Sequence, residues 1–505
     1  MAGGRGATAG GARLALVLAV VLALAGAAPA AGDPTGADGR PTVTETIREA
    51  GTPGETTAAE TATGTADQSS DGAVEIETEG FDPDYDPAAV LDRVERLRGL
   101  SARQGITLHE YEPPADETYD ARDSFGAIRP AGAKALQLYS NASTERRTPL
   151  GYTVERQAAV HIYLLNDSAL AAHDVSQQAV LAHEFVHALQ FQHGLLSPSR
   201  AGLRSEFPRW TTDARLVTTA LVEGDAMWVT EQYLRRYGRG DYSVAEYNRT
   251  LTRAAWTHSV AGTPYYYGYA YYERTGGAPA ERTGAIRDPP GSTAELLHPG
   301  ERVASAPTPP VPELPESAEF PRTHTDTVGE LVVRHALRLN GLSFGRAAAA
   351  ADGWAADRMS YYAGPGAAGP ATHWETVWAS PSEAREFAAA WRAMLAANGA
   401  DGTGEYDADG TGEYDADGTG ENGVETLSVP ASDQAPGMHY AIERDGATVR
   451  ITAAERADTV ERLAEAVAQG AASEAGSADE VDSDGEVRPG GGANATATLS
   501  CPPRP

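Results

Sequence analysis

The sequence predicts an α+β fold that is mostly helical around one histidine-containing helix and includes a small sheet. Three observations predict this class. Residues 158–165 ("AAVHIYLL") are apolar and β-branched, which is typical of a buried strand, and an apolar helix follows them directly. A second long helix is expected at residues 213–237. Near the C-terminus, Asp445-Gly446 stands at the turn of a predicted hairpin.

The N-terminal residues 1–31 have the three parts of a secretory signal peptide. Arg5 and Arg13 give the positive region, residues 14–28 the apolar region, and "APA" at 28–30 a small-x-small cleavage site. An uncleaved anchor is the alternative, but the apolar run is short of the ~20 residues that span a bilayer. We therefore expect a secreted or cell-surface protein with no stable membrane span after cleavage.

The composition is strongly acidic. Asp and Glu number 71 against 40 Lys and Arg, the formal charge is −31, and Lys134 is the one lysine. Such a surface repels nucleic acid and keeps the protein hydrated. The pattern resembles secreted proteins of extremely halophilic archaea, although a generic acidic secreted protein is the alternative. The one cysteine, Cys501, excludes an internal disulfide and cysteine ligands in the folded part.

Three segments lack the pattern of a packed core. Residues 32–80 are rich in Thr, Gly and acidic residues and are expected to be a disordered linker, and residues 470–505 a disordered acidic tail. An octapeptide repeat, "DGTGEYDA", occupies about residues 401–421. It is interpreted as an expanded surface loop, with a calcium repeat as the weaker alternative. One catalytic domain is then expected over residues 81–469.

The remaining elements follow in order. A helix with an apolar stripe at Val90, Val94 and Leu97 begins the domain. The helix after the first strand is expected from Val175 to His193, with Asp174 and Gln177 as a capping box and Gly194 past its end. The helix at 213–237 is followed by an aromatic run at 263–277. The sequence then predicts a turn with a short helix within 288–303 and a Pro-rich extended stretch at 304–325. Three more helices are expected, at about 327–340, 381–397 and 457–469.

The segment "HEFVH" (183–187) places two histidines one helical turn apart. Four residues turn through ~400°, so His183 and His187 project from one stripe while Glu184 lies on its flank. This is the spacing of two zinc ligands and a general base that acts on the metal-bound water. The alternative, two histidines packed in the core, is less expected because the chain contains only 12 histidines.

A catalytic zinc site needs a third protein ligand, and two candidates exist. His193 has the spacing of a third histidine, but the glycine that would end the helix is replaced by Gln190. A continuous helix turns His193 ~280° away from His183. Glu223, in "LVEGDA", lies amid apolar neighbours, where a carboxylate is costly unless it is paired or binds a metal. Glu223 is favoured, and Gly224 beside it indicates close packing of its helix against another.

HEFVH with a glutamate on a following helix resembles the gluzincins, the thermolysin-like class of zincins. More closely, "LAHEFVHALQFQH", "LVEGDA", "TPYYYGYAYYERTGG" and "DPPGSTAELLHPGERV" resemble a family of predicted secreted zincin-like surface proteins of haloarchaea and actinobacteria. The resemblance covers about residues 85–460 without the octapeptide insert. It implies a zincin-like domain in which His183, His187 and Glu223 hold Zn²⁺ and Glu184 is the catalytic base.

One position departs from the gluzincin pattern. Thermolysin-like enzymes have an aspartate four residues after the ligand glutamate, and this chain has Met227 there. Asp213 and Asp225 are the candidates to orient a ligand histidine instead.

A donor to the developing oxyanion is also expected in such a site. The candidates are His298 and the tyrosines at 265–267, each of which packing or a turn would also explain.

The function expected from these features is a secreted zinc-dependent metallopeptidase that acts on peptide or protein substrates. The main alternative is a cell-surface binding protein that retains a zincin fold without turnover. A structural zinc protein is a further alternative, but it would need four protein ligands, and the sequence offers no convincing fourth.

Overall fold

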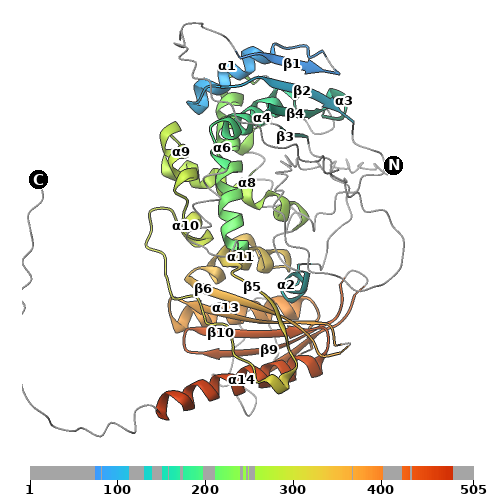
Figure 1. Ribbon diagram of the computed structural model, residues 1–505, viewed down its shortest axis with the longest axis vertical. Coiled ribbons are helices and arrows are strands. Elements are labelled where there is room, and N and C mark those ends of the chain that lie inside the picture. Colours follow the sequence, from blue (N-terminus) through green and yellow to red (C-terminus); the bar gives the residue numbers. More distant parts are fainter. Residues whose placement is uncertain are drawn as a thin grey trace, which may run out of the picture.

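In the computed structural model the protein is built around two separate β-sheets (Figure 1). The structure describes residues 74–80, 82–112, 130–138, 150–156, 159–170, 175–196, 211–238, 243–245, 248, 256–366, 368–401, 424–432 and 435–480. The predicted signal peptide, most of the predicted linker, the predicted insert from residue 402 onward and the part of the predicted tail beyond residue 480 lie outside the described residues. Among the helices described, none combines the length and apolarity needed to cross a membrane.

The first sheet has four strands in the order β1-β2-β4-β3. They are β1 (Ile76–Glu79), β2 (Ile106–Tyr111), β3 (Gly151–Arg156) and β4 (Ala159–Leu165). β1, β2 and β4 are parallel neighbours, and β3 is antiparallel to β4. The predicted strand at 158–165 is present as β4, and alternate residues of it are buried while the others are partly buried, so one face rather than the whole strand is buried. β1 corrects one boundary, because ordered structure begins inside the stretch predicted as linker.

The helix that carries HEFVH packs on this sheet. α4 (Gln177–Gln192) begins at Ser176, whose side chain accepts from Ala179 N, and it ends at His193 before Gly194 in the left-handed conformation. The predicted start at Val175 is therefore two residues early, and Asp174 lies outside the described residues. α1 (Pro87–Arg98) packs beside α4 through the predicted stripe at Val90 and Val94, and α3 (Asp167–Leu170) is a single turn.

α6 (Thr212–Tyr237) crosses α8 (Trp256–Thr275) at very short range, and it begins and ends within one residue of the prediction. A Cβ at Gly224 would lie 2.2 Å from the Gly268 carbonyl carbon, and one at Gly268 would lie 1.8 Å from the Ala220 oxygen. Only glycine allows this approach. The close packing predicted from Gly224 is confirmed, and it fixes the position of its neighbour Glu223.

The second sheet has six antiparallel strands in the order β5-β6-β7-β10-β9-β8. They are β5 (Arg322–Asp326), β6 (Trp354–Ala363), β7 (Pro370–Trp378), β8 (Val424–Val429), β9 (Met438–Asp445) and β10 (Thr448–Ala454). The hairpin turn at Asp445-Gly446 is confirmed, since Gly446 has φ 55°. The small sheet of the prediction is thus one of two, and the larger one was not anticipated.

Helices cover both faces of the second sheet. α11 (Gly329–Leu339), α12 (Phe344–Ala351) and α13 (Pro381–Ala397) share an apolar core with one face. α14 (Ala457–Glu480) packs on the other face, at the bottom of Figure 1, through Val460 and Leu463. α14 continues past residue 469, so the predicted tail begins eleven residues too early.

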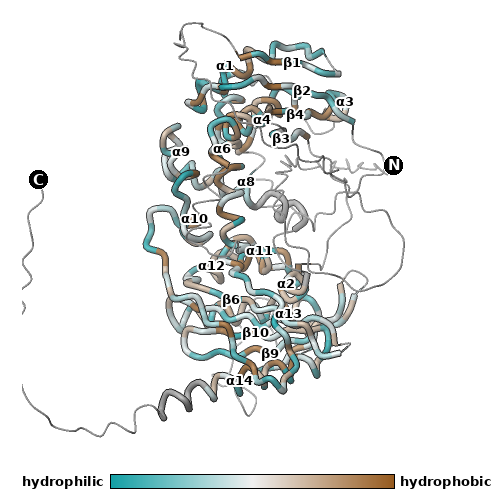
Figure 2. Tube along the Cα trace, in the orientation of Figure 1, coloured by the Kyte–Doolittle hydropathy of each residue, from teal (hydrophilic) through white to brown (hydrophobic). Residues whose placement is uncertain are grey.

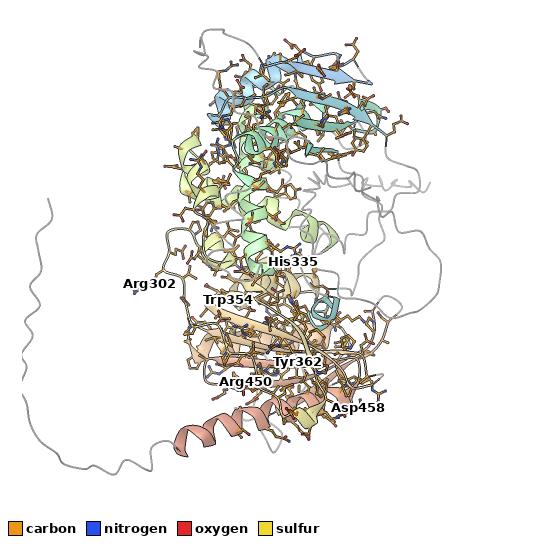
Figure 3. The ribbon with its side chains drawn as sticks, viewed as in Figure 1. Arg302, His335, Trp354, Tyr362, Arg450 and Asp458 are labelled. Carbon is orange, nitrogen blue, oxygen red and sulfur yellow. The ribbon has the colours of Figure 1, made fainter. Side chains whose placement is uncertain are left out.

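Three short helices lie in the sequence between α8 and β5: α9 (Pro279–Arg287), α10 (Thr293–Leu297) and the 3-10 helix η3 (Glu316–Ala318). Figure 2 shows apolar stretches along α4, α6 and α11, inside the molecule. Figure 3 shows side chains filling both regions, with Trp354 and Tyr362 on the second sheet and His335 on α11 above them.

The two sheets are interlocked by α2 (Pro130–Ala135), which lies between β2 and β3 in sequence but packs on the second sheet. Gln137 donates to the Tyr440 hydroxyl at 2.5 Å, and that hydroxyl donates to Ala135 O at 3.1 Å. Lys134 pairs with Glu455 after β10. The α+β class is therefore confirmed, with both sheets in one interconnected fold.

Candidate metal centre

Two buried histidines of α4 face each other at ligand spacing. His183 and His187 have no exposed surface, and their Nε2 atoms are 3.1 Å apart. They lie one turn apart on the same stripe of the helix, as the sequence predicts. Two imidazole nitrogens at this separation can bind one ion.

Glu223 of α6 completes the group. Its Oε2 is 3.6 Å from His183 Nε2 and 3.4 Å from His187 Nε2, and it is a buried atom without a hydrogen-bond partner. The three ligand atoms lie within 4.8 Å of one another, and no other such group of three occurs in the described part of the chain. Two imidazoles and one carboxylate around an otherwise unsatisfied oxygen fit a divalent transition metal.

His193, the other candidate third ligand, lies outside this group. α4 continues through Gln190 and places His193 at its C-terminal cap, where Nε2 lies 2.7 Å from Ser101 O. The continuous helix thus turns His193 away from His183 and His187, as the presence of Gln190 predicts.

Both ligand histidines meet an oxygen at Nδ1. His187 Nδ1 is 2.8 Å from Gln190 Oε1, and His183 Nδ1 is 3.4 Å from Thr230 Oγ1, whose proton goes to Ala226 O at 2.8 Å. An Nδ1–H donated to these oxygens leaves each Nε2 lone pair free for a metal. The sequence did not predict these contacts of Gln190 and Thr230 with the two histidines. The spacing of Gln190 and Thr230 on the two helices, three residues after His187 and seven after Glu223, could have indicated them.

Asp225 fixes Gln190 and thereby acts on His187 indirectly. Gln190 Nε2 donates to Asp225 Oδ2 at 2.9 Å, and that carboxylate also accepts from Arg98 Nε and Arg282 Nε, each at 2.7 Å. All four side chains are buried. The other candidate for orienting a ligand histidine, Asp213, accepts from Thr293 instead and takes no part in this contact.

Glu184 lies on the flank of the ligand stripe, against the first sheet. Its Oε2 accepts from Thr153 Oγ1 of β3 at 2.7 Å, while its Oε1 is buried without a hydrogen-bond partner. A Cβ at Gly151 would lie 3.1 Å from that Oε1, so glycine lets β3 approach the carboxylate. Glu184 therefore has one oxygen fixed and one available.

Burial and charge separate the pKa values of the group. Burial raises the pKa of Glu184 to about 7 and lowers that of His183 to about 4. Burial alone would lower the pKa of His187, but the Glu223 carboxylate outweighs it and raises this pKa to about 9. Burial would raise the pKa of Glu223, and the two histidines overcome it and lower the value. Without a metal, an ionised Glu223 thus faces a protonated His187.

Of the predicted oxyanion donors, Tyr265 of α8 stacks on a candidate ligand, with its ring centroid 6.5 Å from that of His183. Tyr266 and Tyr267 of the same helix contact the ring of Phe344 of α12 instead. His298 lies 3.1 Å from Glu330 of α11, so these three side chains face the helices that cover the second sheet.

Comparison with known proteins gives a match only for the stretch that contains the second sheet. Residues 318–464 match a family described as "Domain of unknown function (DUF8575)". No curated protein and no solved structure gives a significant match. The matched stretch is less than a third of the chain, and it contains the strands from β5 to β10 but neither α4 nor α6. The candidate metal centre therefore lies entirely outside the part of the chain that this family describes.

Proposed function

We propose that this chain is a secreted, zinc-dependent metallopeptidase of zincin-like fold that hydrolyses peptide bonds. One observation carries the proposal. Three buried ligand atoms, from His183, His187 and Glu223, converge while Glu184 stands beside them with an unpartnered oxygen. Two histidines and one carboxylate form a ligand set of catalytic zinc sites, and the adjacent glutamate has the position of the general base.

The donor set favours zinc in a catalytic role. Nitrogen and carboxylate oxygen ligands suit Zn²⁺, and a structural zinc site would normally close with four protein ligands. The described residues supply three. A zinc ion held by these three ligands would keep a fourth coordination position for water and substrate, as catalysis requires.

Bound zinc would acidify its water and polarise the substrate carbonyl. Glu184 is placed to accept the proton, because Thr153 holds Oε2 and leaves Oε1 for this task. Burial raises the pKa of Glu184 to about 7, close to the value that suits a general base at neutral pH. Glu184 can then pass the proton to the leaving amine.

The first sheet offers a place for an extended peptide. β3 is at the end of the strand order, so one edge of it pairs with no described strand. The same strand carries Thr153, which contacts Glu184. An extended peptide added to this edge by main-chain hydrogen bonds would pass beside the metal centre. This placement supports a peptide or protein as the substrate.

The composition supports an extracellular site of action. The formal charge of −31 opposes nucleic acid as a partner, and residues 1–31 have the pattern of a secretory signal. The alternative, a surface protein that binds without turnover, differs from the proposed peptidase in one property, which is hydrolysis.

Glu184→Gln is the decisive variant for this proposal. We expect it to keep the fold and one zinc ion per chain and to lose peptide hydrolysis, because Gln cannot accept the proton while the three ligands remain. Zinc is measured by elemental analysis and hydrolysis with a quenched fluorescent peptide mixture. Loss of zinc in this variant would contradict the role given to Glu184. Zinc-loaded wild type without turnover would favour the binding protein.

A further inference from the structure

A second pair of histidines lies on the outer face of the first sheet. His109 of β2 and His161 of β4 are diagonal neighbours, because Thr107 stands opposite His161 and His109 opposite Tyr163. Residues 107, 109 and 111 alternate with the buried Ile106 and Leu108, so these side chains point away from α4. This pair lies on the opposite side of the sheet from HEFVH.

The two imidazoles approach each other at ligand spacing. His109 Nε2 lies 3.1 Å from His161 Nδ1, the same separation as between the Nε2 atoms of His183 and His187. Diagonal neighbours on adjacent strands are close enough for two imidazoles to meet over one ion. The nitrogen pair thus has the separation found at the candidate metal centre, although its ring planes are inclined by 26° rather than 70°.

A carboxylate stands behind one of the histidines. Glu79 of β1 is opposite His109 in the sheet, and its Oε2 lies 3.4 Å from His109 Nδ1. A ligand histidine usually donates its second ring N–H to a carboxylate, which fixes the tautomer and makes the other nitrogen the ligand. Glu79 therefore prepares Nε2 of His109, the nitrogen that faces His161.

We propose that His109 and His161 bind a second divalent transition-metal ion, with Glu79 orienting His109 and water completing the coordination. Imidazole pairs suit zinc, nickel and copper. The ion would join β2 to β4, with β1 attached through Glu79. In a chain whose one cysteine is Cys501, such a link would cross-brace the sheet that supports α4, as a disulfide does elsewhere.

The outer pair differs from the metal centre in ways that set its affinity. It has two protein ligands in place of three, and the His109 side chain is 16% exposed whereas that of His183 is fully buried. We therefore expect weaker and faster-exchanging binding than at His183, His187 and Glu223. The inference does not rest on peptide hydrolysis, because a metal ion at this pair would need no role in catalysis.

The test is a titration of the full chain with Ni²⁺ after removal of metal by a chelator. Wild type should bind about two ions per chain, one tightly and one weakly, and His161→Asn should retain only the tight one. His109→Asn should do the same, which keeps the test valid if one variant folds poorly. Excess Ni²⁺ should also raise the melting temperature of wild type more than that of either variant.

Tyr163→Phe is the matched control, because Tyr163 stacks on His109 with centroids 4.5 Å apart but Phe keeps the ring and adds no ligand. It should retain both ions. If wild type and His161→Asn bind the same number of ions, the pair is only an N–H···N hydrogen bond and the proposal is wrong. Glu184→Gln should keep the outer ion, so failure of the peptidase proposal and failure of this one give different results.

Discussion

Both regions of the molecule bury histidines and lower the pKa of at least one of them, but around the first sheet a buried carboxylate faces the histidines as well. Around the second sheet, His373 Nδ1 contacts Thr452 Oγ1 at 2.9 Å, and burial lowers the pKa of His373 to about 4. His335 on α11 is similar, with its pKa lowered by burial to about 3. Around the first sheet, His187 faces the Glu223 carboxylate, which raises its pKa to about 9.

The difference shows what distinguishes a metal centre from a packed histidine. His335 and His373 are buried, burial lowers the pKa of each, and neither belongs to a group of three ligand residues in the described chain. At the first sheet two imidazoles and a carboxylate converge, although each is costly to bury alone. Convergence of ligand atoms, rather than burial, is therefore the property that the following variants test.

The largest expected effect is loss of the metal on changing Glu223. Glu223→Ala leaves two histidines and water as ligands, so metal content after dialysis should fall below roughly a tenth of an ion per chain, and hydrolysis should fall with it. His193→Ala is the matched control and should change neither, because His193 contacts Ser101 O at the end of α4. Metal loss in His193→Ala with retention in Glu223→Ala would transfer the third-ligand role to His193.

The next effect concerns the helix crossing that positions Glu223. Gly268→Ala places a Cβ 1.8 Å from Ala220 O, so α6 and α8 must separate, at a cost of about 3 kcal/mol. The melting temperature should fall by roughly 5 °C. Gly284→Ala in α9 meets no atom within 4 Å and should leave stability unchanged or raise it by about 0.5 kcal/mol. Equal melting temperatures for the two variants would contradict the close crossing.

The sequence predicts local features of both regions well. α6 and the β9–β10 hairpin appear at the expected residues, because helical periodicity, end caps and an Asp-Gly turn are encoded by neighbours in the chain. The docking of α2 on the second sheet was not predictable in this way. It depends on Gln137 meeting Tyr440, residues that no local pattern connects.

The candidate site shows the same division. His183, Glu184 and His187 follow from the period of one helix, and Glu223 from the cost of a buried carboxylate. Gln190 appears in the sequence only as a residue that continues the helix. In the structure Gln190 contacts Asp225, which in turn contacts Arg98 and Arg282. These contacts join four helices, so they depend on tertiary packing rather than on a local pattern.

A smaller loss is expected when this supporting contact is removed and the ligands remain. Gln190→Ala deletes the acceptor for His187 Nδ1 and should weaken metal binding about 10- to 100-fold, measured by competition with a chelator. Gln192→Ala, two residues further along α4, removes only contacts to the backbone of residues 103 and 104 and should bind metal as wild type does. If the two variants bind metal with the same affinity, Gln190 contributes only packing. Its contact with His187 would then not distinguish the histidines of the first region from those of the second.

The smallest effect is expected where the two regions meet. Asp213, at the start of α6, accepts from Thr293 and lies against Gly329 at the start of α11. Burial, assisted by Asp357 and Asp326 of the second sheet, raises its pKa from 3.8 to about 7, although the hydrogen bonds from Thr293 act to lower it. A carboxyl group whose pKa is higher in the folded protein binds more protons folded than unfolded, so stability falls as the pH rises from 3.8 to about 7.

Asp213→Asn removes this dependence while its side-chain oxygen can still accept from Thr293. The free energy of unfolding, measured with denaturant at pH 5, 6 and 7 in excess zinc, should then fall less steeply with pH than in wild type, by up to about 1.4 kcal/mol per pH unit. Asp458, an exposed residue of α14, provides the control, because Asp458→Asn should leave the slope between pH 5 and 7 unchanged: Arg456 lowers the pKa of its carboxyl below the ordinary value. Parallel slopes for wild type and Asp213→Asn would mean that this carboxyl is ionised in the folded protein. Asp213 would then be a charged buried side chain, as Glu223 is, rather than a neutral one, as His335 and His373 are.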